Sequence, residues 1–211
     1  MIPAKEEWHK ALTARHGEEL QRKLDRATVA VCGLGGLGSN IAVALTRAGV
    51  GRLILIDFDK VDITYLHRQQ YKITQIGKNK TEALSENLSE IAPYTERETH
   101  TVRIDESNAQ ELLKDADIIC EAFDNAECKA MLTNLVLETM PDKFLIAASG
   151  MAGLGSPNAI RTRRITDKFY LSGDGVSDVG DDIGLVAPRV MLCAAHQAQT
   201  VIRILAEQFD I

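Results

Sequence analysis

The chain has 211 residues, of which 45% are hydrophobic and 26% are charged, and its formal net charge at pH 7 is −6. This composition is that of an ordinary globular protein, and the acidic excess disfavours a general role in binding nucleic acid or a membrane surface. No apolar run approaches the roughly 20 residues that a membrane span requires, and the N-terminus lacks the apolar segment of a signal peptide. We therefore expect a cytoplasmic protein whose residues 1–211 form one domain.

The first segment of the chain is an N-terminal arm, residues 1–26. Within it, residues 4–24 carry apolar side chains at helical spacing among charged ones, which predicts one amphipathic helix or two, with a break at Gly17. The arm precedes a core, 27–150, in which strands and helices alternate, and a C-terminal part, 151–211.

A glycine-rich turn follows the first predicted strand. The apolar, β-branched run 28–32 leads into this turn and a helix over 39–48, and a second apolar strand, 53–57, ends in Asp57. This order is typical of a βαβ unit that binds a nucleotide. One glycine permits the tight turn, one lets the backbone approach a phosphate, and the last lets the helix pack closely on the strand. The helix N-terminus attracts the phosphate, and Asp57 is suitably spaced to bond ribose hydroxyls. The glycines of this turn are Gly33, Gly35, Gly36 and Gly38.

The remainder of the core continues the alternation. Residues 58–71 form a polar, weakly periodic segment that is too long for a simple turn, and such segments are often functional. The patterns then predict a helix over 79–91, a strand over 98–104, a helix over 108–114, a strand over 118–122, a helix over 126–139 and a strand over 144–148. Alternation over five strands predicts an α/β fold with a Rossmann-like, mostly parallel sheet covered by helices on both faces.

The C-terminal part breaks this alternation. Residues 159–165 and 168–171 are predicted to form antiparallel strands that extend the sheet. A loop rich in Gly, Asp and Ser follows over 172–187, and Pro188 suits the first turn of a final helix that ends near Glu207.

Two cations and an acid are predicted at the same edge of the sheet. Arg68 and Lys80 follow the second strand, and Asp124 follows the fourth, so all three can reach the carboxyl edge where ligands bind. With Asp57 they suit a nucleoside triphosphate with Mg²⁺ better than a dinucleotide. Each residue also has a simpler interpretation: Arg68 as a surface ion pair, Lys80 as a solvated helix residue, and Asp124 as a helix N-cap.

The cysteines do not suggest a metal site. Cys32, Cys120, Cys128 and Cys193 form no C-x-x-C pair, so no structural zinc is expected. Cys32 and Cys120 lie in apolar strand-like runs and are predicted to be core residues, and Cys193 is predicted to pack on the apolar face of the last helix.

Five motifs in order point to a family. They are Gly-Leu-Gly-Gly-Leu-Gly-Ser-Asn at 33–40, Leu-Ile-Asp-Phe-Asp at 55–59, Leu-His-Arg-Gln-Gln-Tyr at 66–71, Ile-Gly-Lys-Asn-Lys at 76–80 and Phe-Asp-Asn-Ala at 123–126. Together they resemble the ubiquitin-activating-enzyme-like ThiF/MoeB superfamily. Within it the chain is similar to the short ThiF type, the adenylyltransferases of the sulfur carrier ThiS in thiamine biosynthesis. The resemblance covers residues from about 15 to 205.

The resemblance implies an enzyme that uses ATP and Mg²⁺. The C-terminal glycine carboxylate of a ubiquitin-like carrier attacks the α-phosphorus of ATP, giving an acyl-adenylate and pyrophosphate. It implies that Asp57 holds the ribose, that Arg68 and Lys80 bind the phosphates, and that Asp124 binds Mg²⁺ or orients the α-phosphate. Asp59 and Asn125 are further nucleotide-binding candidates. No general base is needed, because the attacking carboxylate is already ionised at neutral pH.

The resemblance also implies a homodimer in which an N-terminal arginine completes the partner's site. Arg15 is the candidate for this role, with Arg22 as an alternative. The chain departs from its relatives at Tyr65, where many of them have asparagine. It also lacks their zinc-binding cysteine pairs and the crossover-loop cysteine that bonds covalently to the carrier, with Cys193 as the only substitute near that loop. We therefore predict activation without a covalent intermediate through the 172–187 loop.

Other functions stay open at this point. A related enzyme could activate another carrier or a modified tRNA base, for which Arg161, Arg163 and Arg164 form a local basic patch. The glycine turn also permits an NAD-dependent oxidoreductase or a nucleotide-sensing module without turnover.

Overall fold

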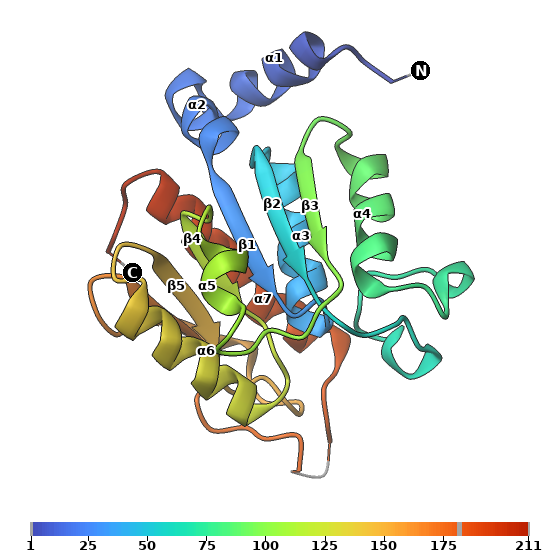
Figure 1. Ribbon diagram of the computed structural model, residues 1–211, viewed down its shortest axis with the longest axis vertical. Helices are drawn as coiled ribbons and strands as arrows, with labels where there is room; N and C mark the ends of the chain where they lie inside the picture. Colours follow the sequence, from blue (N-terminus) through green and yellow to red (C-terminus); the bar gives the residue numbers. More distant parts are fainter. Residues whose placement is uncertain (1, 181–182, 211) are drawn as a thin grey trace.

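The computed structural model describes residues 2–180 and 183–210, and its strands form one sheet (Figure 1). The strands are β1 (Thr28–Cys32), β2 (Arg52–Ile56), β3 (Glu96–His100), β4 (Ile118–Glu121), β5 (Phe144–Ala148), β6 (Arg161–Arg164) and β7 (Phe169–Gly173). Their order across the sheet is β3-β2-β1-β4-β5-β7-β6. All neighbours pair in parallel except β6, which pairs antiparallel with β7 at the edge. The predicted α/β fold with an antiparallel extension is confirmed.

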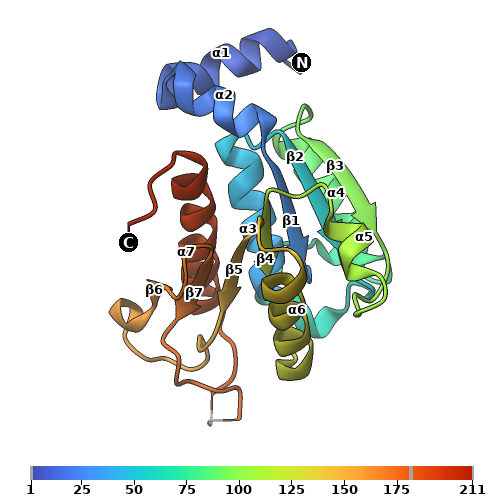
Figure 2. The same cartoon turned by 60° about the vertical axis from the view of Figure 1, so that its left-hand side comes forward.

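Helices cover both faces of the sheet (Figure 2). The helices of the described residues are α1 (Lys5–His16), α2 (Glu18–Arg26), α3 (Gly36–Ala48), α4 (Lys80–Ile91), α5 (Ala109–Leu113), α6 (Ala126–Thr139) and α7 (Ala187–Leu205). Short 3₁₀ turns occur at Ile63–Tyr65, Ile73–Gln75 and Pro157–Ala159. Helices α3, α4 and α7 pack on one face of the sheet, and α5 and α6 pack on the other. None of the described helices is both long and apolar enough to cross a bilayer.

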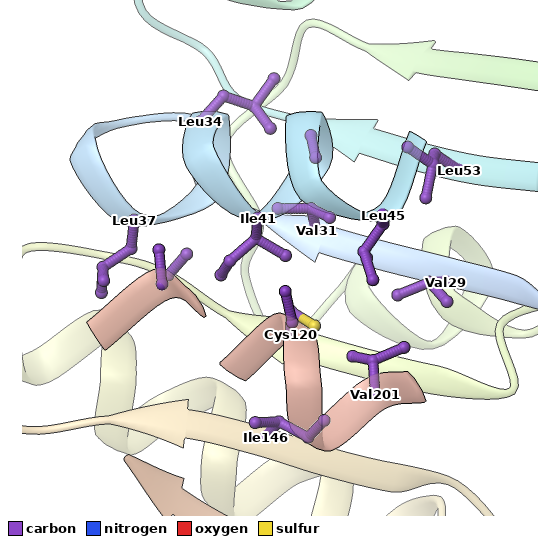
Figure 3. Packing of buried hydrophobic residues seen from close by; sticks show 14 of the residues in the cluster. Val29, Val31, Leu34, Leu37, Ile41, Leu45, Leu53, Cys120, Ile146 and Val201 are labelled. Atoms are coloured by element: carbon purple, nitrogen blue, oxygen red, sulfur yellow. The ribbon is translucent and has the colours of Figure 1, made fainter. Parts of the chain in front are cut away.

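The core follows from the alternation of side chains along β1. Val29 and Val31 point into the layer formed with α3 and α7, whereas Ala30 and Cys32 join the layer under α5 and α6. Figure 3 shows Ile41 and Leu45 of α3 in the first layer. Strands buried on both faces read as continuous apolar runs, which is why the sequence locates them well. The layers also contain the buried cysteines Cys32, Cys120 and Cys193, as predicted.

Most predicted boundaries are close to the observed ones, and two differ for identifiable reasons. The third strand ends at His100 rather than at residue 104, because its partner β2 ends at Ile56, which pairs with His100. Helix α3 begins at Gly36, before the predicted start at residue 39. Glycines lower the predicted helical tendency there, but Gly36 and Gly38 already belong to the helix.

A buried ion pair ties the segment before α7 to the start of that helix. Arg189 Nη2 lies 2.5 Å from Asp174 Oδ2, and both side chains are buried. Arg189 Nη1 also donates to the carbonyl oxygens of Gly155 and Ser156, at 2.6 and 3.0 Å. Although burial opposes ionisation, hydrogen bonds from the backbone N–H groups of Ser177 and Val176, the Ser177 hydroxyl and Arg189 bring the pKa of Asp174 down to about 2.

We predict that Asp174→Asn lowers the free energy of unfolding by about 3 to 5 kcal/mol at neutral pH, because Arg189 would stay buried without its carboxylate partner. The lowered pKa of Asp174 means that its contribution is complete above about pH 4 and disappears as the pH falls through about 2. Urea titrations at neutral pH and at a pH near 2 should therefore give a gap between wild type and variant that narrows in acid.

The matched control is Asp167→Asn, which removes the partner of Arg164 in an exposed ion pair. It should change the unfolding free energy by less than about 1 kcal/mol. Equal losses in the two variants would contradict a structural role for the Asp174–Arg189 pair.

Candidate functional site

A cavity of about 740 Å³ opens at the carboxyl edge of the sheet, at the ends of β1, β2, β4 and β5. Every candidate site residue from the sequence except Gly38 and Arg15 lines it. The lining thus includes Gly33, Gly35, Gly36, Asp57, Asp59, Arg68, Lys80, Asp124 and Asn125. Residues from all five motifs therefore meet in one space, as the parallel topology predicts.

The glycine turn brings α3 directly against the end of β1. Gly33 has φ +90°, and a Cβ there would lie 3.0 Å from the carbonyl oxygen of Ala122. A Cβ on Gly38 would lie 1.8 Å from the carbonyl oxygen of Gly33, so only glycine permits this approach. Gly38 therefore has the packing role predicted for it, and Gly35 and Gly36 present the backbone to the cavity.

Asp57 clamps the glycine turn. Its Oδ2 accepts a hydrogen bond from the backbone N–H of Leu34 at 2.6 Å, and its Oδ1 accepts one from the N–H of Asp59 at 2.7 Å. The hydroxyl of Tyr71 donates to the carbonyl oxygen of Leu34 at 2.8 Å from the other side. Burial raises the pKa of Asp57, while Lys80 and the backbone donors oppose that rise. The sequence did not predict this structural role.

Lys80 is 4% exposed, so it is not a solvated helix residue. Its Nζ donates to Asp59 Oδ2 at 2.8 Å and lies 3.8 Å from Asp57 Oδ2. The ammonium group therefore sits at the wall of the cavity between two carboxylates.

Arg68 lies against the glycine turn, and its Cγ and Cδ would be 3.5 Å from a Cβ on Gly36. Within residues 2–180 and 183–210 it forms no ion pair with a carboxylate, and its buried Nε has no hydrogen-bond partner. Its Nη1 lies 3.2 Å from His67 Nε2. The surface ion-pair interpretation of Arg68 is thus not supported, and the guanidinium keeps donors for an anion in the cavity.

Asp124 is exposed at the mouth of the cavity, next to the start of α6. The helix cap is Asn125, whose Oδ1 accepts from the N–H of Cys128 at 2.9 Å. The carboxylate of Asp124 is therefore not used as the cap.

Arg15 lies on α1, and α1 and α2 sit beyond the amino end of β1, at the opposite end of the sheet from the cavity (Figure 1). No residue of α1 is buried. The structure thus does not bring Arg15 to the cavity of its own chain.

Three groups at the cavity were not among the predicted site residues. Glu121 is 1% exposed, and both its oxygens accept from Lys129 Nζ, at 3.1 and 3.0 Å. Burial raises the pKa of Glu121 against the opposing effect of Lys129. Gln69 is 7% exposed and lines the cavity with its Oε1 unpartnered. The sequence did contain a signal for Glu121, because it is an acidic residue within the otherwise apolar run 118–122.

The third unpredicted group is a cysteine. Cys193 was expected to be the only cysteine near the loop before α7, but Cys128 lines the same cavity as Ser177 and Val179 of that loop. Cys193 itself is buried in the core, and burial raises the pKa of its thiol to about 12. Cys128 reaches this cavity because α6, far away in the sequence, begins at this edge of the sheet.

A model of the ThiF family matches residues 9–210 of the chain. The chain belongs to the ThiF family. The resemblance inferred from the five motifs is thereby confirmed.

Two curated relatives match the chain over a little more than half its length. The adenylyltransferase and sulfurtransferase MOCS3 of Caenorhabditis briggsae is 36% identical over 123 residues, which are 57% of this chain and 31% of that protein. The sulfur carrier protein adenylyltransferase of Thermus thermophilus is 37% identical over 110 residues, which are 52% of this chain and 41% of that protein. The match thus spans less than half the length of each relative.

Solved structures share the fold over almost the whole chain. The tRNA N6-threonylcarbamoyladenosine dehydratase TcdA of E. coli, in complex with ATP, superposes with a TM-score of 0.86 at 18% identity and covers 99% of this chain and 98% of that chain. E. coli MccB with AMPCPP and MccA superposes with a TM-score of 0.68 at 25% identity. The match covers 90% of this chain and 59% of the MccB chain. At the low identity to TcdA, the likeness establishes the fold.

We predict that Gly38→Ala destabilises the protein by about 3 kcal/mol or more, because the new Cβ would overlap the Gly33 carbonyl and push α3 away from β1. Urea unfolding measures this loss. Gly184→Ala is the control, since, its two chain neighbours apart, no described residue has an atom within 4 Å of its added Cβ, and it should stay within about 0.5 kcal/mol of wild type. A Gly38→Ala variant as stable as Gly184→Ala would contradict the close approach.

Proposed function

We propose that this chain is an ATP-dependent adenylyltransferase that activates the C-terminal glycine carboxylate of a ubiquitin-like sulfur carrier. ThiS of thiamine biosynthesis is the proposed carrier. The observation that carries the proposal is the cavity in which the glycine turn, Asp57, Arg68 and Lys80 meet. Membership of the ThiF family and the names of the curated relatives, which include a sulfur carrier protein adenylyltransferase, support it.

Two cations favour a triphosphate over a dinucleotide in this cavity. Arg68 keeps unpartnered donor capacity, and Lys80 is held at the cavity wall by Asp59. Phosphate oxygens of either ligand could compete with Asp59 for the ammonium, but a triphosphate carries more negative charge than the pyrophosphate of a dinucleotide, so two cations suit it better. The TcdA structure, determined with ATP, has a fold similar to that of this chain, which is consistent with this choice. An NAD-dependent oxidoreductase is therefore not our proposal.

The proposed reaction joins two anions, so charge neutralisation is its main requirement. The carrier carboxylate would attack the α-phosphorus while the bond to pyrophosphate breaks, and the electron pair of that bond leaves with pyrophosphate. Arg68 and Lys80 would hold the phosphates and stabilise the negative charge that develops on the leaving group. The N–H groups at the start of α3 would add to this field. No residue needs to take a proton, because the carboxylate attacks in its ionised form.

Asp124 is our candidate for holding Mg²⁺. Among residues 2–180 and 183–210, no three His, Cys, Asp or Glu side chains are grouped to hold a metal alone. A single exposed carboxylate still fits, since Mg²⁺ in such sites takes most of its ligands from substrate phosphates and water. When bound, the ion would neutralise phosphate charge beside Arg68 and Lys80.

The remaining parts of the proposal concern the whole protein. Because Arg15 lies at the other end of the sheet, it could act only in the cavity of a second copy, so we propose a homodimer with this contact in trans. We propose that the arm, core and C-terminal part work as one adenylation domain in the cytoplasm. The 172–187 segment contains no cysteine, and we propose activation without a covalent bond to that loop.

A modified tRNA base is the second candidate substrate. Arg161, Arg163 and Arg164 are exposed on the edge strand β6, and TcdA, a tRNA dehydratase, shares the fold. Arg164 already pairs with Asp167, and the net charge of the chain is negative, so the carrier is favoured.

The function is tested by ATP–pyrophosphate exchange with purified carrier proteins that end in Gly-Gly. We expect labelled pyrophosphate to enter ATP only when protein, carrier and Mg²⁺ are all present. Absence of exchange with every such carrier, from protein that is folded and binds ATP, would reject the proposal.

We predict that Lys80→Ala lowers the exchange rate about 100-fold or more, because a preorganised positive group would be missing from the transition state. Lys60→Ala is the control, since Lys60 is exposed and lies outside the cavity lining, and it should exchange at the wild-type rate. Melting temperatures of both variants establish that they are folded. Equal rates in folded Lys80→Ala and Lys60→Ala would contradict the phosphate role of Lys80.

A further inference from the structure

The ring of Tyr65 lies next to both cations of the cavity. The Cζ atom of Arg68 is 5.4 Å from the ring centroid, and the Nζ atom of Lys80 is 5.1 Å from it. Both distances are within the range of cation–π attraction.

Local structure fixes Tyr65 relative to these two residues. It ends the 3₁₀ turn Ile63–Tyr65, which Asp62 caps by accepting from the Thr64 N–H. The backbone N–H of Arg68 donates to the carbonyl oxygen of Tyr65 at 3.2 Å, so Arg68 follows Tyr65 by one hydrogen-bonded turn of the backbone. The ring is half-buried at the place where this turn meets the start of α4.

The positive charges of Arg68 and Lys80 explain why a group that attracts both of them is needed. Two cations that converge on one phosphate chain repel each other before the phosphate arrives. Lys80 is held on one side by Asp59, but Arg68 forms no ion pair within the described residues. The negative face of an aromatic ring attracts both cations without neutralising either of them. A carboxylate in the same place would instead compete with the phosphates.

We propose that Tyr65 is a positioning residue that holds Arg68 and Lys80 as a pair for the polyphosphate of the nucleotide. This inference rests on the proposed function. The ring acts through the two cations, so it contributes to affinity for the phosphates and not for the nucleoside. The aromatic ring is required and the hydroxyl is not.

The test compares the affinities of the full-length protein for ATP and for adenosine by titration calorimetry. Tyr65→Leu should weaken ATP binding about 10-fold, because both cation–π contacts are lost, and leave adenosine binding unchanged. Tyr65→Phe keeps the ring and should bind both ligands as wild type does. Tyr94→Leu is the matched control, since Tyr94 is also half-buried but has no cation of the described residues over its ring, and both affinities should stay unchanged.

Four results would overturn the inference. Unchanged ATP affinity in Tyr65→Leu would mean that the ring does not support the cations, and it would leave the proposed function intact. Equal losses for ATP and adenosine would mean that the ring only maintains the local fold. A Tyr65→Phe variant as weak as Tyr65→Leu would assign the effect to the hydroxyl. If wild type itself binds ATP no better than adenosine, the proposed function fails together with the inference.

Discussion

The site depends on the contact between Gly38 of α3 and the backbone of Gly33 at the end of β1. No side chain fits between the two, so the helix begins at the very edge of the sheet. Gly36 and Leu37 at the start of α3 line the cavity, and so do Asp57, Phe58 and Asp59 after β2. Asp57 and Tyr71 hold the intervening Leu34 from two sides, which stabilises the turn. An edge built in this way offers a fixed place for an anion before any ligand binds.

Around this edge the charges are arranged in opposing pairs. Lys80 lies between Asp57 and Asp59, and Glu121 is bound by Lys129 deeper in the same cavity. Arg68 is different, since among residues 2–180 and 183–210 its guanidinium contacts an aromatic ring and a histidine but no acid. Buried charges are costly unless they are paired, so a cation without an acidic partner at a cavity wall indicates a place for an anionic ligand.

The sequence predicted those features that follow from local pattern. The spacing of apolar residues predicts the strands, and the glycines predict the turn. The parallel topology predicts that Arg68, Lys80 and Asp124 meet at one edge of the sheet. Features that depend on partners distant in sequence were missed. The end of β3 is set by the end of β2, the Asp57 clamp on Leu34 is a tertiary contact, and Cys128 reaches the cavity only because α6 starts there. The place of Arg15, far from its own cavity, likewise depends on how the N-terminal arm packs.

The central claim is that Arg68 and Lys80 receive a phosphate chain at the glycine turn. A crystal structure of the protein with ATP and Mg²⁺ tests it most directly. The account predicts the triphosphate between the start of α3 and these two side chains, with the ribose beside Asp57. Phosphates bound elsewhere, with both cations turned toward solvent, would contradict it.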